Sequence, residues 1–415
     1  MVELPSLTFC PVPWMHLELQ GDGSVVFCRT HGNKRIGQLT NTAPLDELKT
    51  IWNSEDQISI RSRMLSGACV PECGKCFRNE RFGSFSTRTL ANKIYTERIR
   101  PSVLKTKSSG ECPDFAPLYL SLKTSTHCNC RCRTCGPWNS SGWLRDYKAM
   151  TGLSYKNPAL NENRILQTLE ALVSRLELLY FVGGEPLLSE LHYRALDLVL
   201  AQGRNDLHLS YSTNLTTLKL KHWSVLDYWK NFERVTLSIS VDAIGARNDY
   251  LRKGSDWHTL LENRELLRKH APHVKILVHP TISVFNVATL PQYVEWMLKH
   301  QFVDDPSGSF IFNRLEEPEH LSIQVLPKAM KAEISRELQN FQLNHLLANT
   351  PIEKCLTTLR GLSGILAFMN EEDQSAKLPK FVSETIKLDQ LRGESVLQTF
   401  SELRCLFVAS NVSQS

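Results

Sequence analysis

Residues 118–135, LYLSLKTSTHCNCRCRTC, join an apolar segment directly to a run of cysteines. The first six residues have the composition of a β-strand, and three cysteines follow in the spacing C-x3-C-x2-C: Cys128, Cys132 and Cys135. Three thiolates this close in one loop can bind three irons of a four-iron cluster and leave the fourth iron without a protein ligand. A zinc knuckle, with Cys130 as a further ligand, is the alternative that the spacing alone leaves open.

Strand and helix patterns alternate from about residue 117 onward. The strand candidates are Leu118–Lys123, Leu176–Val182, Leu207–Ser212, Arg234–Val241 and Val274–Val284, with Leu321–Leu326 as a further candidate. Apolar residues recur at helical spacing in Arg164–Leu178, Leu191–Ala201 and Trp257–Lys269. This alternation predicts an α/β fold with a mainly parallel sheet, open or closed into a complete or partial barrel. Functional residues in such folds gather at the carboxyl ends of the strands.

A second motif, Gly183-Gly184-Glu185-Pro186, ends the second strand candidate. Two glycines let backbone atoms approach a ligand closely, and a carboxylate can accept hydrogen bonds from an ammonium group. The four residues alone are typical of a turn. Their position after a strand, downstream of the cysteines, favours a binding element.

The cysteine spacing after the first strand and Gly-Gly-Glu-Pro after the second together resemble the radical S-adenosylmethionine (radical SAM) superfamily. The resemblance implies a partial (β/α)6-type TIM barrel and a 4Fe–4S cluster on Cys128, Cys132 and Cys135, whose open iron binds S-adenosylmethionine (SAM). It also implies that SAM is cleaved reductively to a 5′-deoxyadenosyl radical, which abstracts a hydrogen atom from a substrate. In the family, the element corresponding to 183–186 contacts the methionine amino group.

Three further segments resemble parts of the family's SAM site. Ser212 and Asn214 close the third strand with groups suited to a ribose. Ser240 and Asp242 close the fourth strand, and Arg252 follows; in relatives the serine and arginine commonly contact the SAM carboxylate. A surface ion pair is the alternative for Arg252. Many relatives have an aromatic residue just before the third cysteine, whereas this chain has Thr134.

The N-terminal cysteines resemble a SPASM/twitch module, which holds an auxiliary iron–sulfur cluster. The resemblance is carried by Cys10-x-x-Pro13-Trp14, a hairpin over 10–28, Cys28, Ile36-Gly37, a helical pattern over 44–66 that includes Ile51-Trp52-Asn53-Ser54, and Cys73-x-x-Cys76. It implies a second 4Fe–4S cluster with four ligands, Cys10, Cys28, Cys73 and Cys76; a zinc site is the alternative. Cys69 is interpreted as a bystander or a substitute ligand.

The remaining single residues favour packing roles. Cys112, Cys355 and Cys405 are expected to be buried thiols, and Trp138 and Tyr180 are expected in the core. We expect four regions: an auxiliary module over 1–104, a linker over 105–116, the radical SAM core over 117–327 and a helical C-terminal region over 328–415.

Bulk composition excludes little. The 415 residues carry a formal charge of +5 and are 42% hydrophobic, as in an ordinary globular protein, and nucleic acid is not indicated. No apolar run approaches the ~20 residues that cross a bilayer, and the first residues do not resemble a secretory signal, so we expect a cytoplasmic protein without a membrane partner. Cysteines clustered in a reducing compartment favour metal or iron–sulfur binding.

The expected activity is hydrogen-atom abstraction from a peptide or protein side chain, because relatives with an auxiliary module often modify peptides. The expected reductant is a cytosolic electron donor such as flavodoxin or ferredoxin. The alternatives are the same chemistry on a small molecule, such as a sugar, nucleoside or amino-acid derivative, and a non-catalytic zinc or electron-transfer protein.

Overall fold

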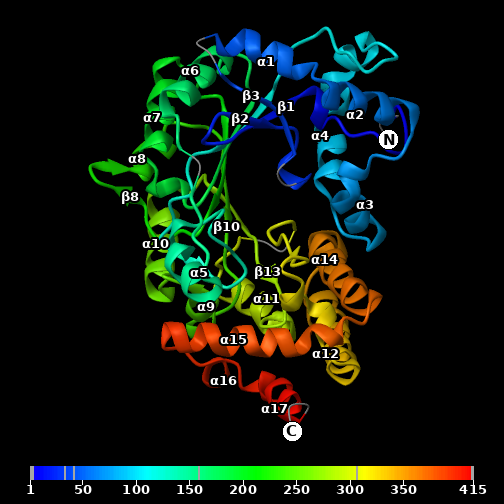
Figure 1. Cartoon of the computed structure of the whole chain (residues 1–415), viewed down its shortest axis with the longest axis vertical. Coiled ribbons are helices and arrows are strands. Elements are labelled where there is room, and N and C mark those ends of the chain that lie inside the picture. Colours follow the sequence, from blue (N-terminus) through cyan, green and yellow to red (C-terminus); the bar gives the residue numbers. More distant parts are fainter. Residues whose placement is uncertain (1–3, 32–33, 41–42, 158, 305–306, 413–415) are drawn as a thin grey trace.

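The computed structural model describes residues 4–412 apart from 32–33, 41–42, 158 and 305–306. An eight-stranded sheet runs through its centre (Figure 1). Five parallel strands follow one another in chain order: β4 (Tyr119–Lys123), β6 (Leu178–Val182), β7 (His208–Thr213), β10 (Val235–Ile239) and β12 (Lys275–Val278). The first four strand candidates are therefore confirmed within two residues at each end, and the fifth over its first part. The α/β fold with a central parallel sheet is also confirmed.

The two faces of this sheet differ in chemistry. On β7, Leu209, Tyr211 and Thr213 are buried, whereas the alternating His208, Ser210 and Ser212 are only half-buried. The apolar face is covered by helices (Figure 1), namely α6 (Glu162–Leu172), α7 (Glu190–Ala201), α8 (Val225–Trp229), α10 (Trp257–His270) and α11 (Leu290–Lys299). The other face is polar and partly open, because side chains on a strand alternate between faces.

The far edge of the sheet differs from the prediction. The segment Val274–Val284 is two strands, β12 and β13 (Thr281–Ile282), because Pro280 between them has no backbone N–H to continue the ladder. The expected strand Leu321–Leu326 is wrong: it forms two short 3-10 turns, and its apolar side chains are buried rather than paired in a sheet. The sheet ends instead at a bridge between Val278 and Phe310, beside a short ladder of β13 with β14 (Asn313–Arg314).

The N-terminal hairpin belongs to the same sheet. Its strand β1 (His16–Leu19) pairs in parallel with β4, and β2 (Ser24–Val26) and β3 (Arg35–Gln38) add antiparallel strands beyond it. The hairpin prediction is confirmed. Pairing of β1 with β4 places the end of β2 close to the polar face of the parallel strands.

The rest of the N-terminal region is helical. The pattern over 44–66 forms two helices, α1 (Pro44–Trp52) and α2 (Glu55–Ser66), with a break at Asn53-Ser54; α3 (Gly74–Arg81) and α4 (Thr87–Lys105) follow. The irregular segment after α4 is fixed by two indoles, because Trp14 donates to Thr106 Oγ1 (2.9 Å) and Trp52 donates to the Asp114 carbonyl (3.0 Å).

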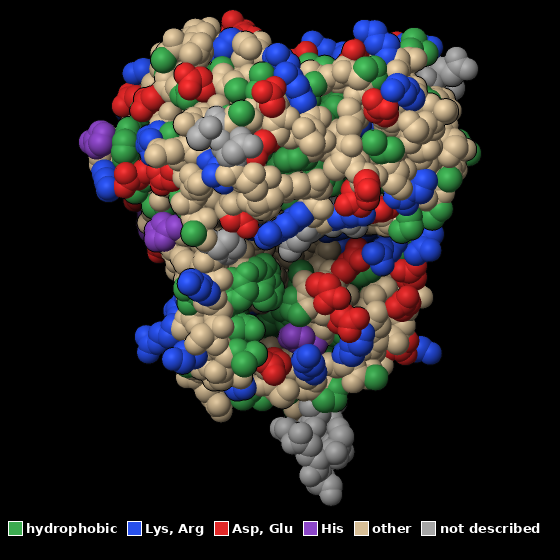
Figure 2. All heavy atoms as spheres, turned by 45° about the horizontal axis from the view of Figure 1, so that its top comes forward, with side chains coloured by type: hydrophobic (Ala, Val, Ile, Leu, Met, Phe, Trp, Pro, Cys, Tyr) green, Lys and Arg blue, Asp and Glu red, His purple; other side chains and the backbone are tan. Residues whose placement is uncertain are grey.

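The remaining helices support the strand ends and form the C-terminal region. They are α5 (Leu144–Thr151), α9 (Ala246–Leu251), α12 (Lys328–Phe341), α13 (Leu347–Asn349), α14 (Ile352–Glu371), α15 (Leu378–Arg392), α16 (Val396–Thr399) and α17 (Arg404–Val412). Short ladders are formed by β5 (Arg131–Cys132) with β11 (Arg252–Lys253) and by β8 (Lys219–Leu220) with β9 (Trp223–Ser224). Figure 2 shows a hollow in the middle of one face of the molecule. Within the described residues, no helix has the length and apolar character needed to cross a membrane.

Candidate functional site

The loop that carries Cys128, Cys132 and Cys135 follows β4 at the carboxyl edge of the parallel strands. Its centre is the short strand β5, and β11 pairs with it antiparallel so that Arg252 lies opposite Cys132. The Arg133 N–H donates to the Leu251 carbonyl (2.8 Å), which extends this ladder. Local pairing therefore brings together the cysteine loop and a cation 120 residues downstream.

The thiols of this loop differ in acidity. Cys130 is fully buried and lies within hydrogen-bond reach of both Cys128 and Cys132. These hydrogen bonds lower the pKa of Cys128, lower the pKa of Cys132 to about 7, and raise that of Cys130. Burial raises the pKa of Cys135 to about 12. Cys130 is thus placed to donate to the sulfurs of Cys128 and Cys132, the two thiols whose pKa is lowered.

The donor set fits an iron–sulfur cluster. All twelve cysteines are free thiols, and Cys128 and Cys135 are partly exposed. Across the residues that the structure describes, no three His, Cys, Asp or Glu side chains converge closely enough for one metal ion. Thiolates are the ligands that iron–sulfur clusters use most often, so the chemistry of the donor set suits such a cluster.

The two glycines after β6 let the strand end touch the cysteine loop. A Cβ at Gly183, where φ is +143°, would lie 2.5 Å from the Ser125 carbonyl oxygen, and one at Gly184 would lie 2.2 Å from that of His127. The Gly184 and Glu185 N–H groups donate to these same carbonyls at 2.9 and 2.8 Å. The glycines thus permit close approach, as expected, but in this structure the approached group is the protein's own backbone.

Glu185 joins neighbouring strand ends. Its carboxylate accepts hydrogen bonds from the Leu187 N–H (3.1 Å), the Thr213 hydroxyl (2.7 Å) and the Asn214 N–H (2.7 Å). Burial raises the pKa of this carboxyl group, although these hydrogen bonds oppose the shift. Pro186 begins a short 3-10 turn. The side chain is therefore already engaged in holding β6 against the end of β7.

The two polar residues predicted at the end of β7 have different neighbours. The Asn214 amide donates to Asn129 Oδ1 (3.0 Å) and to the sulfur of Cys130 (3.3 Å), and lies 3.9 Å from the sulfur of Cys128. Ser212 shares a hydrogen bond of 2.5 Å with the Tyr180 hydroxyl on the polar face. Asn214 is thus in contact with the cysteine loop, whereas Ser212 lies two residues earlier, within β7.

Arg252 forms a buried ion pair. Its Nη1 donates to Asp242 Oδ2 (2.9 Å), and the other oxygen of Asp242 accepts from the Thr281 N–H (2.8 Å). Burial alone would lower the pKa of Arg252, but Cys132 and Asp242 outweigh it and raise that pKa. The buried Arg252 Nε has no hydrogen-bond partner among the described residues. Half-buried Ser240 adjoins this pair in sequence, and its N–H donates to the Thr213 carbonyl (2.8 Å).

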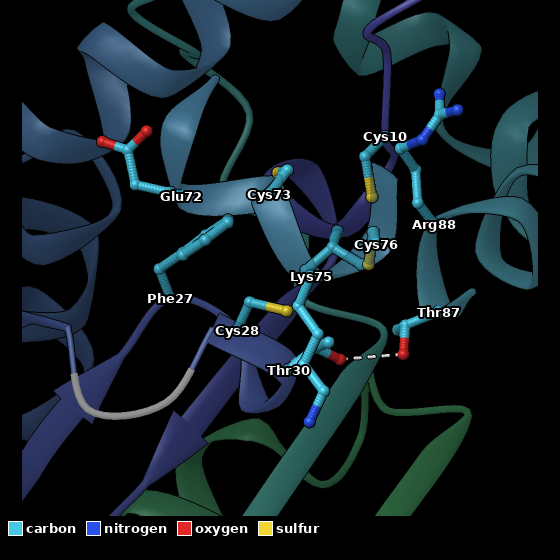
Figure 3. A pocket seen from close by; sticks show the side chains of 11 residues that line it. Cys10, Phe27, Cys28, Thr30, Glu72, Cys73, Lys75, Cys76, Thr87 and Arg88 are labelled. Carbon is cyan, nitrogen blue, oxygen red and sulfur yellow. Dashed lines mark hydrogen bonds between the residues drawn. The ribbon is translucent and has the colours of Figure 1, made fainter. Parts of the chain in front are cut away.

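A second group of thiols lies in the N-terminal region. One small pocket is lined by all four cysteines that the sequence assigns to an auxiliary site: Cys10, Cys28, Cys73 and Cys76 (Figure 3). Burial, and then the charges of neighbouring thiols, raise the pKa of Cys73 to about 12 and that of Cys10 well above its usual range. Four thiolates in so small a space would repel one another, and bound iron would offset their charge.

Other cysteines and aromatics lie elsewhere. Cys69 is exposed and does not line the pocket, and Cys112 and Cys355 are buried as expected. Cys405 is exposed, so its expected burial is wrong. Trp138 is 49% exposed and is not part of the core, whereas Tyr180 is buried on the polar face.

Two features of the site are absent from the sequence predictions. Arg29 lies over the Tyr180 ring, 4.4 Å from its centroid, and only its adjacency to Cys28 could have suggested a role. Arg133, inside the cysteine loop, forms buried ion pairs with Asp389 (2.5 Å) and Glu394 (2.6 Å), at the end of α15 and just after it. The partners of these ion pairs are far apart in the chain, so no local sequence pattern could have predicted them.

Two family models match the chain. That of the radical SAM superfamily matches residues 122–296, and that of an iron–sulfur cluster-binding domain, SPASM, matches residues 10–77. No curated protein matches.

Solved structures with a similar arrangement include native anSMEcpe with bound AdoMet, at 16% identity and a TM-score of 0.41; the match covers 56% of this chain and 62% of that one. Streptococcus suis SuiB bound to precursor peptide SuiA matches at 13% identity and a TM-score of 0.40, over 78% of this chain and 68% of that one. The same protein bound to S-adenosylmethionine matches at 13% identity and a TM-score of 0.38, over 78% and 67%.

Proposed function

Since this chain belongs to the radical SAM superfamily and carries a SPASM iron–sulfur cluster-binding domain, we propose that it cleaves SAM reductively and abstracts a hydrogen atom from a substrate. The observation that carries the proposal is the meeting of the cysteine loop, the Gly183–Pro186 element and Arg252 at one edge of the parallel sheet. Three thiols can bind a cluster that keeps one iron open. The backbone element and the cation can then bind the amino group and the carboxylate of the methionine part of SAM.

The residues have separate tasks in this proposal. Cys128, Cys132 and Cys135 hold the catalytic cluster, and Cys10, Cys28, Cys73 and Cys76 hold the auxiliary one. A bound catalytic cluster supplies the electron that cleaves the sulfonium bond of SAM to methionine and a 5′-deoxyadenosyl radical. The protein fixes the loop by hydrogen bonds from the Asn214 amide and the Arg133 N–H.

The same edge offers contacts to the methionine part of SAM. The free Nε of Arg252 can donate to its carboxylate, because Nη1 is already held by Asp242 and keeps the guanidinium in place. Ser240 and the backbone of the Gly183–Pro186 element are proposed to complete the contacts to the carboxylate and the amino group. Ser212, on the open polar face, is proposed to face the ribose.

The substrate we propose is a peptide or protein side chain, supported by the SPASM domain. The proposed reductant is a cytoplasmic donor of the flavodoxin or ferredoxin type, because free thiols in such number are typical of a reducing compartment. A perdeuterated cell extract, divided by size into polypeptides and metabolites, tests the substrate class. If the polypeptide fraction transfers deuterium to 5′-deoxyadenosine, the substrate is a peptide or protein, as proposed. If only the metabolite fraction transfers deuterium, the substrate is a small molecule and the proposal of a peptide substrate is wrong.

The activity itself is tested by anaerobic reconstitution with iron and sulfide, followed by SAM and dithionite. We expect 5′-deoxyadenosine, with at least a 100-fold loss in Cys135→Ala and wild-type yield in Cys405→Ala, whose thiol is exposed and lies on α17. Absence of 5′-deoxyadenosine from protein that contains its full iron and sulfide would contradict the proposal.

A further inference from the structure

The helix α15 ends beside the catalytic cysteine loop, although the C-terminal region to which it belongs lies outside both family matches. It packs against α5, the helix that follows the cysteine loop in the chain (Figure 1). Asp389 and Arg392 lie in the last turn of α15, and Glu394 follows just beyond it. Directly or through Asp146, these three side chains contact the two arginines that flank Cys132.

The carboxylate of Asp146 joins the arginine before Cys132 to the end of α15. Arg131 Nη1 donates to Asp146 Oδ1 (2.9 Å), and Asp146 Oδ2 accepts from the Nε of Arg392 (2.9 Å). The side chain of Asp146 is 2% exposed, and that of Arg392 is fully buried. Buried charges are screened less by water and salt than surface charges are. The charges of Arg392 and Asp146 therefore act on their surroundings with little screening.

Trp143 links Arg392 to Cys132 by a second route. Its indole N–H donates to the Cys132 carbonyl (2.8 Å), and the guanidinium of Arg392 lies over its ring, 4.7 Å from the centroid. One indole therefore separates Arg392 from the backbone of Cys132. The buried Nη1 and Nη2 of Arg392 have no hydrogen-bond partner among the described residues. The positive charge of this guanidinium is thus only partly compensated by its contact with Asp146.

The other charged groups around the loop are arranged in pairs of opposite sign. The pairs are Arg133 with Asp389 and Glu394, Lys253 with Glu394, and Arg252 with Asp242. Lys123 at the end of β4 and Glu185 after β6 add one further charge of each sign, and the thiolates of a bound cluster are negative. Since the charges are paired, substitution of one member changes the local net charge by one unit, with the sign of the charge that is lost.

We propose that α15 tunes the reduction potential of the catalytic cluster through Arg392, whose charge raises that potential, and that its partner Asp146 lowers it. Reduction adds one electron to a cluster, so a nearby cation favours the reduced state and a nearby carboxylate opposes it. This role rests on the proposed function, since it assumes a cluster on Cys128, Cys132 and Cys135. The C-terminal region thereby takes part in the electron transfer that precedes cleavage of SAM.

The test is an anaerobic redox titration of the reconstituted full-length protein, without SAM and with dithionite as the electron donor. Electron paramagnetic resonance follows the reduced clusters, and the catalytic cluster is identified as the one whose signal changes when SAM is added to a parallel sample. At a fixed potential, we expect the ratio of reduced to oxidised catalytic cluster to fall about fivefold or more in Arg392→Gln and to rise about fivefold or more in Asp146→Asn. Arg392→Lys retains the charge but not the planar group, so its ratio should stay near that of the wild type.

A buried arginine on the other face of the sheet provides the matched control. Arg264, on α10, has a 7% exposed side chain and an ion pair with Asp304 (3.3 Å). Arg264→Gln should therefore leave the ratio as in the wild type.

The signs of the shifts separate an electrostatic role from a merely structural one. Both Arg392→Gln and Asp146→Asn break the same ion pair, so a structural role would move the potential in the same direction in the two variants, or not at all. Either result overturns the inference. If Asp146→Asn binds no iron, the comparison of Arg392→Gln with Arg392→Lys decides, and equal ratios in these two variants overturn it. Wild-type protein with its full iron and sulfide but no signal that responds to SAM would instead contradict the proposed function.

Discussion

Gly254, directly after β11, lies against the cysteine loop. Its φ is +99°, and a Cβ there would lie 2.3 Å from the Asn129 carbonyl oxygen. Gly254→Ala must push the loop away, so we expect loss of about four irons per chain after reconstitution, one cluster's worth. Gly203→Ala is the matched control, because φ is +69° but no atom lies within 4 Å. Equal iron content in the two variants would contradict this account of the loop.

Glu185 is expected to stabilise the strand ends by its charge. Glu185→Gln replaces one accepting oxygen by an NH2 group that faces hydrogen-bond donors, which should cost about 1–3 kcal/mol of unfolding free energy. Glu190→Gln is the control, because its side chain is 46% exposed. Anaerobic denaturant unfolding measures both variants. An effect of Glu185→Gln no larger than that of Glu190→Gln would show that the three hydrogen bonds add nothing.

His192 makes the fold sensitive to acid. Burial lowers the pKa of this imidazole to about 3, so between about pH 3 and 6.5 the unfolded chain binds more protons than the folded one. Stability therefore rises with pH in that window, and a change from pH 7.5 to 5.0 should cost about 2 kcal/mol through this group. His192→Gln should reduce the loss by that amount, measured as the shift of the denaturation midpoint between the two pH values. His258→Gln, at an 86% exposed position, should leave the shift as in wild type.

At the scale of elements, α15 supports the catalytic loop through Asp389. This carboxylate accepts from Arg133 (2.5 Å), the Tyr250 hydroxyl (2.8 Å) and the Val396 N–H (2.6 Å). Asp389→Ala leaves Arg133 with only part of its compensating charge, so we expect a loss of about 3 kcal/mol and weaker retention of the catalytic cluster. Asp373→Ala, an exposed position, is the control. Unchanged stability and iron content in Asp389→Ala would contradict a supporting role for α15.

Elements with a local signal were predictable and those that depend on distant pairing were not. Apolar segments bounded by polar loops predicted β4, β6, β7 and β10 to within two residues at each end. The prediction of a strand at Leu321–Leu326 was wrong because this segment is buried and irregular, and its composition is as apolar as that of a strand. The pairing of β1 with β4 has no local signature, since about 100 residues separate partners that hydrogen-bond through their backbones.

The same distinction holds for the site. The cysteine groups were visible as spacings, and the structure places Cys10, Cys28, Cys73 and Cys76 around one pocket. Arg252 lies opposite Cys132 and forms a buried ion pair with Asp242 rather than the surface ion pair that was the alternative, and its contact with the SAM carboxylate stays a prediction. Arg29 could not be found, because its place depends on the hairpin joining the sheet beside Tyr180.

At the scale of the whole molecule, one sheet carries both proposed cluster sites. The auxiliary cysteines extend from the hairpin end of the sheet, and the catalytic cysteines follow its parallel strands. The polar face between them is the common space on which substrate, SAM and the auxiliary module meet in this account. Two separate clusters are therefore its central claim.

The metal content of anaerobically purified protein tests that claim most directly. We expect about eight irons and eight sulfides per chain, falling to about four of each when Cys128, Cys132 and Cys135 are all replaced by Ala, and to about four when Cys73 and Cys76 are replaced. Cys69→Ala should retain all eight, because its thiol lies outside the pocket. About two zinc ions per chain with no sulfide would contradict the account.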